Sequence, residues 1–135
     1  SYLERTAGEY DLPWRNRLIS DVLNLMDAPR FADLFSSDAL SEAPLTGLIK
    51  DRVVMGQVDR LLIRKDHVIF ADYKTNRVAP VGRENIPSAY LKQMAAYHAV
   101  LAKIYPNARI EGVLLWTSSL TAHHLDENFL NPYKP

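Results

Sequence analysis

The chain has 135 residues, 47% hydrophobic and 24% charged, which fits one compact globular domain and excludes a disordered or fibrous protein. Its 16 basic residues balance 16 acidic ones, which excludes the bulk positive field by which a protein captures nucleic acid unaided. The absence of cysteine excludes disulfides, thiolate zinc sites and a cysteine nucleophile.

No apolar run approaches the roughly 20 residues of a membrane helix, and no signal peptide is recognisable at the N-terminus. We therefore expect a cytoplasmic protein that does not contact a membrane. The first residue is Ser1 rather than methionine. We expect residues 1–135 to form a single domain that is an N-terminally truncated piece of a longer protein.

The N-terminal half predicts helices followed by strands. In residues 12–35, apolar residues recur at helical spacing and predict one helix and the start of another. A short strand is expected at residues 45–49. Residues 52–63 carry Val, Leu and Ile on both pleat faces, as an interior strand does, and a tight turn connects them to a strand at 68–74.

The C-terminal half contains the clearest helix of the chain. Apolar residues recur at spacings of three and four between Tyr90 and Ile104, with Ser88 as the expected N-cap and Pro106 as the stop. A loop, a buried strand, a candidate edge strand and a tail are expected at residues 75–87, 110–118, 120–126 and 128–135. This order of elements predicts an α/β domain whose mixed sheet is flanked by helices.

Charged residues at the ends of two strands indicate where chemistry takes place. Side chains alternate along a strand, so Asp72 and Lys74 project to the same face, and Asp59 is an acid within the preceding apolar strand. Burying these charges needs compensation, which a divalent cation with hard oxygen ligands supplies, while Lys74 positions or deprotonates a water. The alternative for Asp72 and Lys74 is an ion pair at the end of a strand.

Two further features favour the metal site over that alternative. Gly56 interrupts a strand-favouring run three residues before Asp59, where a missing side chain marks a bulge or a close approach of the backbone. Gln93 and Tyr97 are four residues apart and lie on one face of the expected helix. Core packing remains the alternative for Tyr97.

These residues form a pattern that resembles a known family. The segments GQVDRL (56–61), ADYKT (71–75) and QMAAY (93–97) are similar to the G-x-x-D-R, D-Y-K-T and Q-x-x-x-Y motifs of the RecB-type nucleases, a branch of the PD-(D/E)XK phosphodiesterases. The resemblance covers residues 42–117. The segments YKTNR, IYP and LLWTS most resemble the C-terminal nuclease domain of the AddA-type bacterial helicase-nuclease subunits.

The resemblance implies a PD-(D/E)XK, restriction-endonuclease-like core with a mixed four-stranded sheet. It implies a Mg²⁺-dependent exodeoxyribonuclease, with Mn²⁺ as a surrogate metal, that acts in double-strand-break end resection and recombinational repair. A helicase motor in the same parent chain would deliver single-stranded DNA, and a second helicase-nuclease subunit would be the partner.

The resemblance also implies roles for individual residues. Asp59, Asp72 and the backbone carbonyl of Tyr73 would be metal ligands, with Lys74 as the catalytic lysine. Supporting or DNA-contacting roles would fall to Gln93, Tyr97 and Glu42, although an exposed loop glutamate is the alternative for Glu42. Arg60 is expected to point to the opposite face and to take no part in catalysis.

One departure from the family pattern leaves other functions open. The family carries a metal-binding histidine upstream of its strands, whereas the first histidine here is His67. His98 is expected on the helix, and His123 and His124 are expected to be surface residues that form a poor metal pair. The alternatives are therefore a catalytically incomplete module that binds DNA or acts as a scaffold, and a free-standing restriction or repair endonuclease.

Overall fold

The computed structural model describes residues 33–34, 36–75, 78–119 and 121–135. The first helix expected in residues 12–35, and nearly all of the second, lie outside the described residues. The main elements, in chain order, are β1 (Leu40–Ile49), β2 (Arg52–Ile63), β3 (His67–Lys74), α3 (Ser88–Ile104), β4 (Arg109–Trp116), β5 (Thr121–Leu125) and α4 (Glu127–Leu130), with short 3₁₀ turns at Arg83–Asn85 and Asn131–Tyr133.

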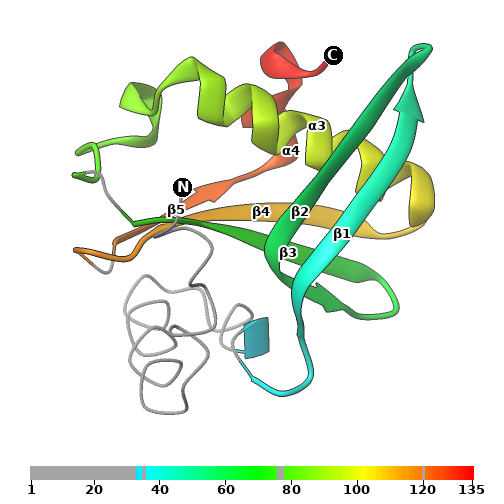
Figure 1. The fold of residues 1–135 in the computed structure, drawn as a ribbon, viewed down its shortest axis with the longest axis horizontal. Coiled ribbons are helices and arrows are strands. Elements are labelled where there is room, and N and C mark those ends of the chain that lie inside the picture. Colours follow the sequence, from blue (N-terminus) through cyan, green and yellow to red (C-terminus); the bar gives the residue numbers. More distant parts are fainter. Residues whose placement is uncertain (1–32, 35, 76–77, 120) are drawn as a thin grey trace.

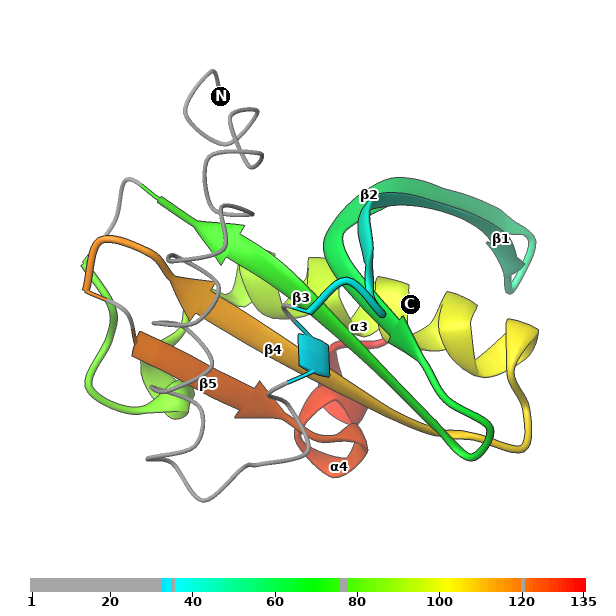
Figure 2. The same ribbon diagram turned by 90° about the horizontal axis from the view of Figure 1, so that it is seen from below.

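The strands form one mixed sheet in the order β1-β2-β3-β4-β5 (Figures 1 and 2). All neighbours are antiparallel except β3 and β4, which run parallel. A parallel pair needs a crossover, and α3 provides it by passing across one face of the sheet. No helix in the described ranges has the length and apolar character needed to span a lipid bilayer.

The two faces of the sheet have separate hydrophobic clusters. The cluster beneath α3 includes Val58, Phe70 and Leu114, whereas Leu62, Ile69 and Val113 belong to the cluster on the other face. Both faces of β3 and β4 are therefore buried, which explains their nearly continuous apolar sequences. The α/β class and the mixed sheet are confirmed, while the four-stranded count is too low by the edge strand β5.

Several predicted boundaries are wrong. Strand β1 begins at Leu40 rather than at residue 45, because Pro44 is tolerated on this edge strand. The first half of β2 is largely exposed, because β3 pairs only with residues 60–63 of β2 and the β1–β2 hairpin extends beyond that ladder. The N-cap of α3 is Pro87 rather than Ser88, because the Pro87 carbonyl already accepts the N–H of Leu91 at 3.3 Å. The expected tail contains α4.

The β1–β2 hairpin changes faces near its open end, far from the turn. Val58 and Leu61 both enter the cluster beneath α3, although strict alternation would place residues three apart on opposite faces. Glu42 and Asp59 lie between the paired positions Ser41–Arg60 and Ala43–Val58, and Glu42 has a positive φ of 51°. The break in the pairing therefore leaves out one residue on each strand, and Asp59 is the one on β2.

Gly56 permits the close approach of α3 to β2. A Cβ atom at this position would lie 2.4 Å from the Tyr97 hydroxyl oxygen and 2.5 Å from Cε1 of the same ring. No side chain fits there unless Tyr97 moves, so the missing side chain marks a close approach, as the sequence predicts. Gly82 offers a contrast, because its Cβ would meet the flexible end of the Glu84 side chain.

We expect Gly56→Ala to lower the free energy of unfolding by about 1–3 kcal/mol, because the added methyl displaces the Tyr97 ring. Urea unfolding measures the change. The matched control is Gly82→Ala, which we expect to stay within about 1 kcal/mol of the wild type, since a flexible side chain can move aside. Equal stability of the two variants would contradict this account of the helix packing.

Candidate active site

The site forms where β2 and β3 stop pairing. Their ladder runs from Ile63–Val68 to Arg60–Ala71, so Asp59 and Asp72 are the next residues on the two strands. One Asp59 carboxylate oxygen accepts the backbone N–H of Tyr73 at 2.7 Å. This contact replaces a regular rung of the ladder and holds the Asp59 side chain against the end of β3.

The Asp59 and Asp72 carboxyl groups contact one another. Burial, a hydrogen bond to Asp72 and the charge of Asp72 together raise the pKa of Asp59 from 3.8 to about 8. Asp59 therefore keeps its proton near neutral pH and donates it to the Asp72 carboxylate. Two adjacent carboxyls with a proton between them are suited to a cation that replaces the proton.

Lys74 lies beside this pair and is only 7% exposed. Its ammonium is 2.9 Å from a carboxylate oxygen of Asp72 and donates to the Gln93 side-chain oxygen at 3.4 Å. It also lies 4.2 Å from the centre of the Tyr90 ring, a cation–π contact. The expected common face of Asp72 and Lys74 is therefore realised as a buried, fully surrounded ion pair.

Gln93 and Tyr97 link α3 to the charged residues. The Gln93 amide nitrogen donates to the Tyr97 hydroxyl at 3.3 Å, so the two are neighbours on the helix, as their spacing predicts. Burial, and then the Asp72 charge, raise the pKa of the Tyr97 hydroxyl. Gln93 is exposed, whereas Tyr97 is buried and contributes to core packing as well as to the site.

Glu42 is separated from this group in its contacts. It is exposed within β1 and lines a surface cavity of about 330 Å³ together with residues such as Leu61 and Leu101. What relates it to the site is its position across the hairpin from Asp59. The expected loop is wrong, because Glu42 belongs to a strand.

The donor atoms fit a divalent cation held by few protein groups. The described residues contain no group of three or more His, Cys, Asp or Glu side chains that could hold a metal ion. Asp59 and Asp72 supply two hard carboxyl donors, and Mg²⁺ is commonly bound through one or two carboxylates with water and phosphate oxygens completing its shell. The Tyr73 carbonyl faces the same neighbouring strand as its N–H, which binds Asp59.

Arg60 points to the opposite face, as expected. Its guanidinium donates to the carbonyl oxygens of Leu34 at 2.9 Å and Ser36 at 2.7 Å, and it also donates to the Ser41 hydroxyl. These contacts fasten the segment before β1 to the sheet. Arg60 is therefore a structural residue next to the candidate site residue Asp59.

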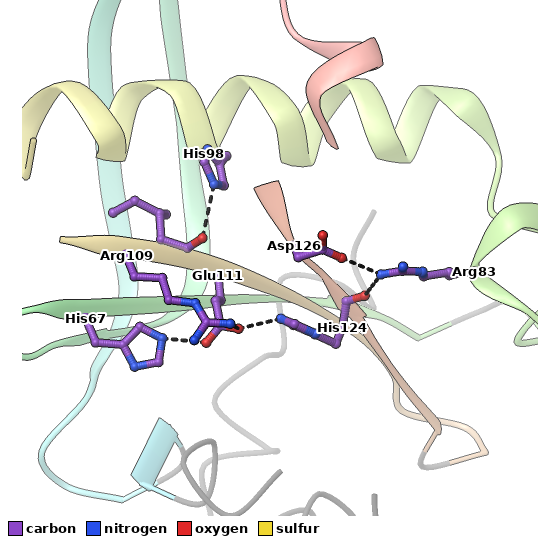
Figure 3. Close-up of polar contacts among 8 residues, drawn as sticks. His67, Arg83, His98, Arg109, Glu111, His124 and Asp126 are labelled. Carbon is purple, nitrogen blue, oxygen red and sulfur yellow. Dashed lines mark hydrogen bonds and ion pairs between the residues drawn. The ribbon is translucent and has the colours of Figure 1, made fainter. Parts of the chain in front are cut away.

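The four histidines have partners in other parts of the fold. His67 and His124 contact the buried Glu111 carboxylate at 2.5 and 2.7 Å, and Arg109 contacts it at 3.0 Å (Figure 3). The expectation that His123 and His124 are surface residues is wrong, because both are only partly exposed and engage buried residues on opposite faces.

Tyr90 is the residue of this site that the sequence prediction missed. Its position in the apolar pattern of α3 suggested core packing, and its ring does pack at the edge of the cluster beneath that helix. Its contact with Lys74 depends on where the crossover places α3 relative to β3, which sequence patterns do not predict. The available signal was its place three residues before Gln93, one helical turn from the same face.

Three comparisons relate the chain to known proteins. The family model of the PD-(D/E)XK nuclease superfamily matches residues 3–128. An ATP-dependent helicase/nuclease protein from Streptococcus equi subsp. zooepidemicus is 35% identical over 94 residues, which cover 64% of this chain and 8% of that protein. The crystal structure of SSO0001 has a TM-score of 0.47 at 16% identity, covering 84% of this chain and 55% of that one.

Because the folded chain holds the Asp59 proton at pH values where the unfolded chain has lost it, we expect stability to fall as pH rises. The contribution of the Asp59 proton to the free energy of unfolding is complete below the unfolded pKa of about 4 and is lost as pH rises through the folded pKa. Between these values the free energy of unfolding falls by at most about 1.4 kcal/mol per pH unit. Urea unfolding in metal-free buffer between about pH 5 and 8 measures it.

Asp59→Asn removes the titrating group, so we expect a flatter stability profile over the same range. The matched control is Asp38→Asn, which changes an exposed carboxylate in a surface ion pair with Arg64. A profile for Asp59→Asn as steep as that of the wild type would show that another group causes the pH dependence.

Proposed function

The chain belongs to the PD-(D/E)XK nuclease superfamily, and from this premise we propose that it hydrolyses phosphodiester bonds of DNA in a metal-dependent reaction. The observation that carries the proposal is the arrangement at the ends of β2 and β3. Asp59 and Asp72 are in contact there, and Lys74 lies 2.9 Å from Asp72. The alternative, a strand-end ion pair beside a solvated Asp59, does not account for Asp59, because its carboxyl is desolvated and hydrogen-bonded to Asp72.

In this proposal Asp59, Asp72 and the Tyr73 carbonyl hold a Mg²⁺ ion, for which Mn²⁺ can substitute. The bound cation supplies positive charge that stabilises the developing negative charge on the phosphoryl oxygens. Cation binding requires Asp59 to release its proton, because ligand carboxylates are ionised. The residues thus fit a divalent cation, because its positive charge would allow both carboxyls to be ionised.

Lys74 orients the attacking water through its ammonium hydrogens. The water oxygen forms a bond to phosphorus, one P–O ester bond breaks, and the departing oxygen takes up a proton, so one product ends in a phosphate and the other in a hydroxyl. The Gln93 side-chain oxygen accepts a hydrogen bond from Lys74, and the Gln93 amide nitrogen donates to the Tyr97 hydroxyl, so both side chains keep Lys74 in position. Glu42 is assigned a supporting role only through its place across the hairpin from Asp59.

The biological setting is inferred from the helicase/nuclease relative, of which this chain spans 8%. We infer that the chain is the single nuclease domain of a cytoplasmic helicase-nuclease, and that it acts as an exodeoxyribonuclease in double-strand-break end resection and recombinational repair. A motor in the same parent chain would deliver single strands, which fits the balanced charge, and a second helicase-nuclease chain would be the partner.

A second candidate is a catalytically incomplete module that binds DNA or acts as a scaffold. The observation in its favour is that the described part of the chain offers two carboxyls at the site and no third metal-binding side chain beside them. The two candidates differ in one outcome, because the module binds DNA without cutting it.

We expect Asp72→Asn and Lys74→Met each to reduce cleavage of a single-stranded oligonucleotide in Mg²⁺ by about 100-fold or more, since each removes a group that acts in the transition state. A fluorescence assay of the 135-residue protein measures the rate, and fluorescence anisotropy measures DNA binding. Binding should be largely retained, because neither side chain is exposed.

The matched controls are Asp38→Asn and Lys103→Met, which change one charge of the same sign at positions remote from the site in their contacts. Both should cleave at the wild-type rate. Cleavage by Asp72→Asn at the rate of its control would contradict the site assignment, and DNA binding without cleavage by the wild type would favour the module.

A further inference from the structure

We propose that Tyr90 is a positioning residue for Lys74, and that Trp116 and His123 hold the Tyr90 ring in place. This inference rests on the proposed function, in which Lys74 orients the attacking water. Tyr90 lies in the first turn of α3, and Lys74 is the last residue of β3, so the contact joins the two ends of the loop that separates these elements.

To orient water, Lys74 needs a contact that leaves its ammonium charged and that does not use a carboxylate proposed to bind the metal. Its ion pair is with Asp72, 2.9 Å away, whose carboxylate is also in contact with Asp59 and is a proposed metal ligand. The Gln93 contact is longer, at 3.4 Å, and comes from an exposed side chain. The Tyr90 ring, 4.2 Å away, attracts the ammonium without neutralising it and without binding a cation through oxygen.

The Tyr90 ring is itself supported from the sheet. It packs against Trp116 with ring centres 6.0 Å apart and planes inclined at 52°. Trp116 in turn meets His123 edge-to-face at 6.2 Å, and its indole N–H donates to the His123 Nδ1 at 2.9 Å. A run of rings therefore extends from the ammonium of Lys74 to the edge strand β5.

The Trp116 contact fixes the protonation state of His123. An indole nitrogen can only donate, so the His123 Nδ1 must be unprotonated to accept this hydrogen bond. Burial lowers the pKa of His123, and the imidazole also forms a hydrogen bond with the Pro80 backbone. The neutral imidazole thus joins Trp116, against which Tyr90 packs, to Pro80 in the loop that follows β3.

Core packing alone would not require an aromatic residue at this position. Tyr90 is only partly buried, at the margin of the cluster beneath α3, where leucine would also exclude water. What leucine lacks is the negative face of an aromatic ring toward the ammonium. The proposal therefore predicts that phenylalanine replaces Tyr90 in function and leucine does not.

The test compares Tyr90→Phe, Tyr90→Leu and the control Tyr133→Leu, which removes a partly buried ring from the same cluster beside Phe129. In NMR spectra with ¹³Cε-labelled lysine, the Lys74 signal is assigned by its loss in Lys74→Met. Ring current should shift it upfield in the wild type and in Tyr90→Phe, and the shift should be lost in Tyr90→Leu.

In the cleavage assay, Tyr90→Leu should lower kcat about 3- to 30-fold with little change in KM, because the lost contact orients a catalytic group rather than the DNA. Tyr90→Phe and Tyr133→Leu should stay within about twofold of the wild-type kcat. An unshifted Lys74 signal in the wild type, or wild-type kcat in Tyr90→Leu, would overturn the proposal.

The two kinds of readout separate this proposal from the proposed function. If the wild type cuts no DNA, the proposed function fails, and the NMR comparison then decides whether Tyr90 positions Lys74. If the wild type cuts DNA and Tyr90→Leu cuts it equally well, the proposed function stands and Tyr90 is a packing residue.

Discussion

The arrangement of the site depends on three ionisable groups that the fold brings out of water together. Asp72 and Lys74 are 8% and 7% exposed, and Asp59 is only partly exposed beside them. Burying two carboxyls and one ammonium leaves one negative charge in excess if all three ionise, and the high pKa of Asp59 is the response of the cation-free protein. A divalent cation would be the other way to remove that excess, so the proposed metal binding follows from the same burial that raises the pKa of Asp59.

The rest of the fold holds this arrangement in place. The end of the β2–β3 ladder brings Asp59 to Asp72, and the parallel pairing of β3 with β4 requires the crossover helix α3 to lie above them. Gly56 lets Tyr97 approach the hairpin, which sets the depth at which α3 lies on the sheet. From that position α3 presents Gln93 to Lys74, so the packing of Tyr97 against Gly56 contributes to placing the partners of the charged groups.

Simple periodicity was enough to predict the common face of Asp72 and Lys74 and the neighbouring positions of Gln93 and Tyr97. These features depend on alternation and helical spacing within one element. The contact of Tyr90 with Lys74 and the partners of His123 and Glu111 depend on how separate elements meet, which the sequence does not state. The start of β1 was missed because Pro44 looks like turn chemistry, although an edge strand accepts it.

The most direct test of the carboxyl site is calorimetric titration of Mn²⁺ into the chain and into its Asp72→Ala variant, with unfolding curves showing that the variant is folded. The wild type should bind the ion, and the variant should show no binding at the same concentrations, because one of the two adjacent carboxyls is gone. Equal binding by both proteins, or no binding by the wild type, would contradict the claim that Asp59 and Asp72 form a site for a divalent cation.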